Sequence, residues 1–256
     1  MAQRTGTDVL PTTYAIKSAL TSPKFGKAFA KGCKGQLVYH DKLPAKGSIA
    51  MFGHPDLISM LHEAQDQGRD WYYGDKAYFG REAYYRVTKN AYMHNAVGEP
   101  DYKRLSKIGI KAQPWRNGSY ILLCPQSPLF FAMQGKNRNE WIYSVTKELK
   151  KHTNRKVRVR ETKKSPGTES AFRKSLDDVW AVVVHSSMAG TQAAMHGVPC
   201  FATDPDCTSA AFGSTDLSLI ESPVKPDNRD DMAAVLAANQ WTLDEIASGM
   251  AWEHIK

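Results

Sequence analysis

Residues 182–201 read VVVHSSMAGTQAAMHGVPCF, which predicts a buried strand, a turn of small residues, a short helix, a Gly-Pro stop and a second strand. The run from Trp180 to Val184 is apolar without polar alternation, as is typical of a parallel strand covered on both faces. Ligands of open α/β sheets bind beyond the carboxyl ends of the strands. At that position the chain has His185, two serines and Gly190, followed by a helix whose free N–H groups can hold a phosphate. The pattern predicts a nucleotide site, although the chain contains neither a Walker motif nor a dinucleotide fingerprint.

Strands and helices alternate through the second half of the chain. Sequence patterns predict strands at 120–124, 156–160 and 180–184, and helices at 141–151 and 171–176. This alternation is typical of a parallel α/β domain. Pro and Gly within 113–119 give the turn chemistry of a linker. We therefore expect a first domain over 1–117 and a second domain over 118–240.

The first half contains one clear βαβ unit. The predicted elements are a strand at 48–52 ending in Gly53-His54, a helix over 55–67, and a strand at 71–73 ending in Gly74-Asp75. The carboxyl ends of parallel strands meet at one edge of a sheet, so both strand ends are expected at that edge. At the other end of the chain, Thr242 and Glu245 have the spacing of a capping box, which predicts a helix within 241–256.

The 182–201 segment resembles the donor-binding motif of GT-B glycosyltransferases, especially the capsule-polysaccharide type. In that family two serines and a glycine precede a helix with an acidic residue, and Gly-x-Pro and a strand follow. When the match is made at 197–199, the acidic position falls on Gln192, whose amide can still bond the ribose hydroxyls of a donor. The whole chain, including QWTLDEI at 240–246, also looks like small glycosyltransferase-like proteins encoded by tailed phages.

The resemblance implies an α/β fold of two Rossmann-like domains facing a cleft, with residues 241–256 packed back on the first domain. It also implies transfer of a sugar from a nucleotide-sugar donor, for which we expect a UDP-sugar, with no permanently bound cofactor. Side-chain cations and a helix N-terminus would replace a divalent metal at the leaving diphosphate, so no metal ligand is assigned.

The donor site is expected at the strand ends of the second domain. The residues assigned to it are Gln126, Ser127, Arg158, Arg160, His185, Ser186, Ser187, Gly190, Thr191 and Gln192. The two serines, Arg160 and His185 have structural alternatives. The two serines can simply cap a helix, Arg160 can belong to a charged strand face, and His185 can be a hydrogen-bonded histidine at a strand end.

Sugar transfer also needs a base that takes the proton of the acceptor hydroxyl. Asp75 is the first candidate and His54 the second, because both are expected at the carboxyl edge of the first sheet. The alternative for Asp75 is a turn-forming role after Gly74. A hydrolase is disfavoured, because the chain has no Gly-x-Ser-x-Gly elbow.

The chain is basic, with a net charge of +8 and an isoelectric point near 9.2. Basic residues gather at Lys24, Lys27, Lys31 and Lys34, and again at Lys147, Lys150, Lys151, Arg155, Lys156, Arg158, Arg160, Lys163 and Lys164. Aromatic and basic residues also alternate from Tyr78 to Asn95, which suits either base stacking or a half-buried pair of strands. These features indicate a polyanionic partner, and we expect double-stranded DNA.

The acceptor expected first is a hydroxylated pyrimidine base, such as a hydroxymethyl pyrimidine, in phage DNA. A glycan acceptor of the capsule type and a non-enzymatic nucleic-acid-binding protein are the alternatives. No apolar run reaches the roughly 18 residues of a membrane span, and the four cysteines form no CxxC pair. We therefore expect a cytoplasmic protein without a membrane partner, a zinc site or disulfides. The oligomeric state is not predicted.

Overall fold

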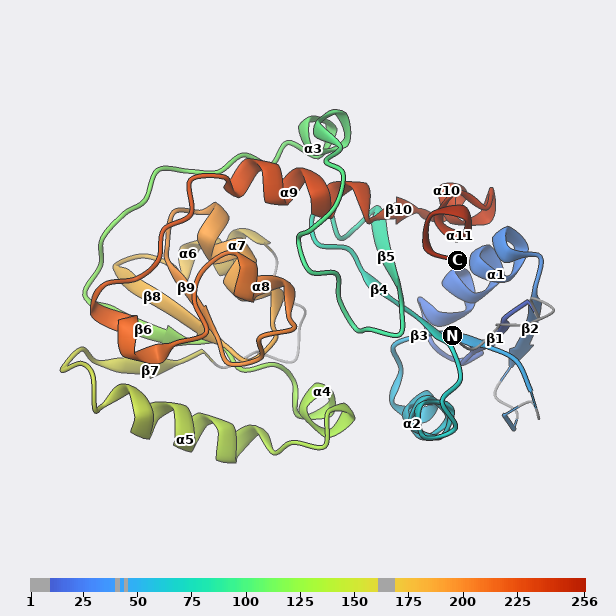
Figure 1. Cartoon of the computed structure of the whole chain (residues 1–256), viewed down its shortest axis with the longest axis horizontal. Coiled ribbons are helices and arrows are strands. Elements are labelled where there is room, and N and C mark those ends of the chain that lie inside the picture. Colours follow the sequence, from blue (N-terminus) through green and yellow to red (C-terminus); the bar gives the residue numbers. More distant parts are fainter. Residues whose placement is uncertain (1–9, 40–41, 44–45, 161–168) are drawn as a thin grey trace, which may run out of the picture. The chain divides into compact units, whose positions relative to one another are not determined.

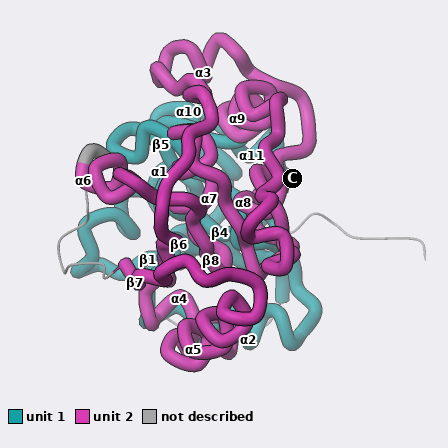
Figure 2. Tube along the Cα trace, turned by 90° about the vertical axis from the view of Figure 1, so that its left-hand side faces the viewer, with its two compact units in different colours: residues 1–93, 239–256 teal, residues 94–238 magenta. Residues whose placement is uncertain are grey.

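The computed structural model describes residues 10–39, 42–43, 46–160 and 169–256 (Figure 1). The chain forms two compact units (Figure 2). The first unit comprises residues 1–93 and 239–256, and the second comprises residues 94–238. The expected boundary at residue 117 lies inside the second unit.

The first unit is built on a six-stranded sheet with the order β10-β5-β4-β3-β1-β2. Its strands are β1 (Thr12–Ala15), β2 (Gln36–Tyr39), β3 (Ile49–Phe52), β4 (Trp71–Lys76), β5 (Tyr84–Lys89) and β10 (Trp241–Thr242). The four strands from β4 to β2 are parallel, whereas β5 and β10 run antiparallel to their neighbours. Helix α1 (Ser22–Cys33) connects β1 to β2, and η1 (Pro55–Leu57) with α2 (Ile58–Asp66) connects β3 to β4. The predicted βαβ unit at 48–73 is therefore confirmed.

The aromatic and basic segment after β4 belongs to the interior of this unit. Tyr78 and Phe79 are 0% and 3% exposed, and Arg86 is 1% exposed. β4 and β5 pair as a hairpin, so these rings pack on the sheet. The half-buried strand pair is the correct interpretation of this segment, and these buried rings are not available for base stacking.

The C-terminal segment completes the core of the first unit. Helix α10 (Leu243–Ala247) begins with the predicted capping box, in which Thr242 and Glu245 bond each other's backbone N–H groups. Helix α11 (Met250–Ile255) follows. Trp241, Ile246 and Ala251 are buried in one cluster with Phe25 and Phe29 of α1. The expected return of the last segment to the N-terminal half is confirmed.

The second unit has a four-stranded parallel sheet with the order β7-β6-β8-β9. Its strands are β6 (Tyr120–Leu123), β7 (Val157–Val159), β8 (Val179–Val184) and β9 (Cys200–Ala202). Its helices are α3 (Tyr102–Ile108), α4 (Pro128–Met133), α5 (Arg138–Leu149), α6 (Glu169–Lys174), α7 (Met188–Met195), α8 (Thr208–Ala211), η2 (Leu217–Glu221) and α9 (Arg229–Ala238). Val182, Val183 and Val184 are fully buried. The apolar run that predicted β8 is therefore apolar because both faces are covered.

The stretch expected to be a linker is bonded to the second unit. Gln113 N–H donates to the carbonyl of Met195, and Arg116 N–H donates to the carbonyl of Gly197. Gly197 has φ of +78°, and a Cβ there would overlap the backbone oxygen of Pro114. Pro and Gly near 113–119 therefore mark a segment that packs on the end of α7.

Candidate functional site

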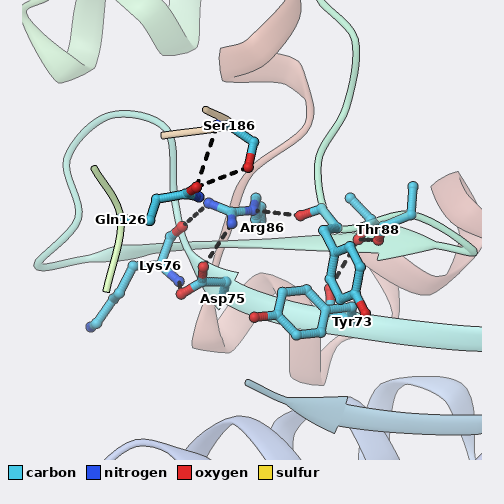
Figure 3. Close-up of polar contacts among 9 residues, drawn as sticks. Tyr73, Asp75, Lys76, Arg86, Thr88, Gln126 and Ser186 are labelled. Carbon is cyan, nitrogen blue, oxygen red and sulfur yellow. Dashed lines mark hydrogen bonds and ion pairs between the residues drawn. The ribbon is translucent and has the colours of Figure 1, made fainter. Parts of the chain in front are cut away.

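The carboxyl edge of the second sheet gathers polar groups from the ends of β6 and β8. Ser187 is the N-cap of α7, and its Oγ accepts from Ala189 N–H at 3.2 Å. Ser186 is buried beside it and donates from Oγ to Gln126 Oε1 at 3.0 Å, while its N–H donates to the same oxygen at 3.3 Å (Figure 3). Gln126 follows β6, so this pair joins the ends of β6 and β8. Ser127 caps α4 through the N–H of Phe130.

Three of the expected donor residues lie within α7. Thr191 is fully buried, and both its N–H and its Oγ1 bond Ser209 Oγ. A Cβ on Gly190 would lie 2.8 Å from the same oxygen, so glycine permits α7 to pack closely on α8. Gln192 is half-buried on α7. Gly190 and Thr191 therefore hold α7 in place, and Thr191 does not reach the polar edge.

His185 lies in the middle of a hydrogen-bonded chain. Its Nε2 is 3.0 Å from Lys136 Nζ, and its Nδ1 is 2.9 Å from Thr203 Oγ1. Trp141 Nε1–H donates to the same hydroxyl at 2.8 Å. The His185 ring stacks on Phe131, with the centroids 5.4 Å apart and the planes 15° apart. Burial and then the charge of Lys136 lower the pKa of His185, while Asp204 opposes them, so the surroundings favour the neutral ring.

Lys136 is the residue of this edge that the sequence analysis missed. It is exposed and follows α4 in a turn through Gly135, whose φ of +65° favours glycine. On the other side of Gly135, Gln134 Nε2 lies 3.5 Å from Ser186 Oγ. Nothing in the sequence around Lys136 distinguishes it from any other surface lysine, because its partner stands 49 residues away.

The two arginines assigned to the donor are held on aromatic rings. The Arg158 guanidinium lies 3.9 Å from the centroid of Tyr120, the first residue of β6, and therefore points away from the carboxyl edge. Arg160 follows β7 at that edge and lies 5.0 Å from the ring of Phe172. The structure therefore places Arg160, but not Arg158, at the carboxyl edge of the sheet.

The first candidate base is the counter-ion of a buried arginine. Asp75 lies inside β4, and its Oδ2 accepts from Arg86 Nη2 at 2.6 Å (Figure 3). Its Oδ1 accepts from the N–H of Lys76 at 2.7 Å. Arg86 also donates to the carbonyl of Lys76 at 2.7 Å and to that of Tyr92 at 3.3 Å. Both oxygens of Asp75 are therefore used within the first unit.

His54 lies at the same edge, because Gly53 N–H donates to the carbonyl of Gly74 at 2.9 Å. His54 Nδ1 accepts from the N–H of Asp56 at 3.3 Å and so begins η1. A depression of about 430 Å³ is lined by Ile16, Lys17, Ser18 and Asp56, at the carboxyl ends of β1 and β3. The side chain of Asp56 is 58% exposed. Asp56 is thus a more accessible carboxylate than Asp75.

Asp204 and Asp206 follow β9 with the spacing Asp-x-Asp. No metal ligand was predicted from the sequence, so this pair was missed. Carboxylates are the ligands that Mg²⁺ and Mn²⁺ prefer. Asp204 Oδ1 accepts from the N–H of Asp206 at 3.1 Å. Within the described ranges, no group of three or more His, Cys, Asp or Glu side chains is placed to hold a metal. Metal independence stays a prediction.

Basic residues lie on both units. Lys24, Lys27, Lys31 and Lys34 are exposed along one face of α1 and its C-cap. In the second cluster, Lys151 pairs with Glu148 at 2.6 Å and Arg155 with Glu221 at 3.1 Å. Lys163 and Lys164 lie outside the described residues. In the part of the chain that the structure describes, no helix is long and apolar enough to cross a membrane.

Two solved structures are similar to this chain over almost its whole length. The first is the Thermosulfurimonas dismutans KpsC beta Kdo 2,7 transferase, with 12% identity and a TM-score of 0.53, covering 95% of this chain and 99% of that chain. The second is the beta Kdo 2,4 transferase of the same organism's KpsC, with 11% identity and a TM-score of 0.51, covering 91% and 92%. No family model and no curated protein matches the chain. The similarity at this identity is one of fold, and it confirms the α/β class with Rossmann-like parallel sheets.

Proposed function

We propose that this protein is a glycosyltransferase that binds a nucleotide-sugar at the carboxyl edge of the second sheet. The observation that carries the proposal is the joined pair of Gln126 and Ser186 beside the N-terminus of α7. It lies where open α/β sheets bind their ligands, on a fold similar to two Kdo transferases. A UDP-sugar and an activated Kdo are the two donors to compare.

In this proposal the acceptor oxygen attacks the anomeric carbon of the donor, and the bond from that carbon to the phosphate oxygen breaks. The leaving phosphate takes the bonding electron pair, and positive groups with helix N–H donors stabilise its charge. A general base takes the acceptor proton. Asp75 and His54 remain the candidate bases from sequence. We add Asp56, because its exposed carboxylate lines the depression at the edge of the first sheet.

We propose a glycan hydroxyl as the acceptor. Four rings that base stacking would need exposed are buried, namely Tyr78, Phe79, Tyr84 and Tyr85, and both neighbours of similar fold are named as Kdo transferases. DNA is the second candidate, because the four exposed lysines along α1 and its C-cap present a row of positive charge that would suit phosphates.

The test is a transfer assay with two donor classes and two acceptor classes. UDP-hexoses and nucleotide-activated Kdo are each supplied with Kdo-terminated oligosaccharides or with duplex DNA containing hydroxymethyl pyrimidines. Products are detected by mass spectrometry, in EDTA and in Mg²⁺ or Mn²⁺. We expect product with the oligosaccharide, and we expect Ser186→Ala with Gln126→Ala to lower the rate by at least about 10-fold, through loss of an anion-facing polar pair.

Ser144→Ala is the matched control, because Ser144 is an exposed serine of α5 whose hydroxyl donates to the carbonyl of Trp141 in its own helix. Transfer to DNA instead of the oligosaccharide, with an affinity that falls steeply with salt, would favour the second candidate. The absence of transfer and of nucleotide binding under all conditions would reject the proposed function.

A further inference from the structure

Lys136 is an exposed residue whose ammonium group is held in a fixed position. Its Nζ lies 3.0 Å from Nε2 of His185, which is 2% exposed, stacked on Phe131 and in tilted contact with Trp141. Because an ammonium group can only donate, Nε2 accepts and the proton of the imidazole is on Nδ1. That N–H then donates to Thr203 Oγ1 at 2.9 Å. The tautomer of His185 is therefore set from both sides.

A neutral partner orients the ammonium group without cancelling its charge. A lysine beside a carboxylate is fixed but neutralised, as Lys151 is by Glu148 at 2.6 Å. A lysine beside a neutral imidazole keeps its full positive charge, and two of its three N–H groups are left for another acceptor. This combination of fixed position and uncompensated charge is what an anion site requires.

The turn that carries Lys136 is attached at two consecutive residues of the β8 end. Gln134 Nε2 reaches Ser186 Oγ at 3.5 Å, and Lys136 Nζ reaches His185. Gln134 also has a buried Oε1 without a hydrogen-bond partner among the described residues. The other basic candidates at the sheet are held on rings, Arg158 by Tyr120 and Arg160 by Phe172.

We propose that Lys136 is the cation that binds the phosphate of the nucleotide-sugar, and that His185 is a positioning residue that holds Lys136 without touching the ligand. The inference rests on the proposed function and deepens it, since it names the group that stabilises the leaving phosphate. It replaces the sequence-based assignment of His185 to the donor site as a residue that contacts the donor.

The first test measures nucleotide binding by calorimetry, with UDP and CMP as the probes. We expect Lys136→Met to weaken binding by about 10- to 100-fold, the range for loss of a hydrogen bond to a charged group. Lys147→Met is the matched control, because Lys147 is an exposed lysine in the last turn of α5, which leads back to the amino edge of the sheet. It should leave binding within about twofold of the wild type, since salt screens distant surface charges.

A double-mutant cycle separates positioning from direct contact. His185→Phe keeps a ring for stacking but removes both nitrogens, so binding should weaken as in Lys136→Met. His185→Gln supplies an oxygen that can accept from Lys136, and it should restore most of the affinity. The variant carrying both Lys136→Met and His185→Phe should bind no more weakly than Lys136→Met alone, because both changes remove the same contact.

The pH dependence gives a further readout. Below the ordinary histidine pKa of 6.5, protonation of His185 would turn Nε2 into a donor facing the ammonium of Lys136. Affinity should therefore fall on acidification more steeply in the wild type than in His185→Gln. The phosphate of the probe titrates in both measurements, so it does not cause the difference between them. Asp204 is the other charged group that acts on His185. Without any ligand, NMR should show that Lys136→Met raises the pKa of His185.

The outcomes distinguish this inference from the proposed function. If the wild type binds UDP or CMP and Lys136→Met binds equally well, the inference is wrong and the proposed function stands. If the effects of Lys136→Met and His185→Phe add, His185 contacts the ligand and is not a positioning residue. If the wild type binds neither probe and transfers no sugar, the proposed function itself is wrong.

Discussion

The group that contacts a basic side chain determines whether that side chain can also bind a ligand. Arg86 is buried against the carboxylate of Asp75, two backbone carbonyls and the ring of Tyr78. The charge of Arg86 is balanced by Asp75 within the first unit. Lys136 is exposed and has a neutral partner. A sequence shows both simply as basic residues, and only the surroundings of each show which one is structural.

At the same scale we predict that Asp75→Asn destabilises the protein. The side chain of Arg86 is 2% exposed, so the change leaves a buried guanidinium without its counter-ion. Breaking such a pair costs about 3–5 kcal/mol, and the lower end is expected because Asp75 itself is 27% exposed. Urea unfolding measures the loss. Asp56→Asn, at an exposed carboxylate, should leave the unfolding free energy within about 0.5 kcal/mol of the wild type.

The same two variants separate the candidate bases. A general base contributes roughly 10²–10⁴-fold to the rate, so the variant that lacks it should lose turnover by that factor under conditions in which it remains folded. If Asp75→Asn is folded but has lost turnover, and Asp56→Asn is active, then Asp75 is the general base. A fully stable Asp75→Asn protein would contradict the structural role of the pair.

At the scale of elements, α1 and the C-terminal helices approach closely at one glycine. A Cβ on Gly32 would overlap the backbone oxygen of Ile246 and lie 3.2 Å from Gly249 Cα. Helix propensity alone favours Gly32→Ala by about 1 kcal/mol, but overpacking costs about 1–3 kcal/mol. Because the clash is with backbone, we predict a net loss of stability in thermal unfolding and faster proteolysis near residues 243–255. Lys31→Ala, on the exposed side of the same helix, is the control and should change little.

Sequence patterns predicted those elements whose signal is local. β8 was found because both faces of it are buried, and α10 because Thr242 and Glu245 form its cap within four residues. β1, β2 and α1 were not predicted. The strands have only four residues each, and α1 contains Gly26 and Gly32, whose helix propensity is low. The contact of Lys136 with His185 has no local signal, because it depends on the return of the chain after α4.

At the scale of the whole molecule, the two units differ in how the chain builds them. The second unit is one continuous segment with its own buried cluster, which includes Ile121, Phe131, Val183 and Phe201. The first unit is closed by residues from the far end of the chain. Trp241 pairs with β5 and is 2% exposed, and Gln240 bonds the backbone of Phe79 in both directions. Residues 1–93 therefore lack a part of their own core.

This difference predicts how fragments of the chain behave. A fragment of residues 94–238 should unfold in one cooperative transition by circular dichroism and keep the nucleotide affinity of the whole chain, because every residue assigned to the donor lies within it. In a fragment of residues 1–93 alone, the surface that Trp241 and Ile246 cover is exposed to solvent. The lost burial free energy is about 1.5–3 kcal/mol for each large side chain. This is a large share of a typical domain stability of about 5–15 kcal/mol. This fragment should show no cooperative transition until a peptide of residues 239–256 is added. Cooperative unfolding of 1–93 without the peptide would mean that this fragment has a complete core without the C-terminal segment. A folded 94–238 fragment that binds no nucleotide would mean that the donor site needs residues outside the second unit.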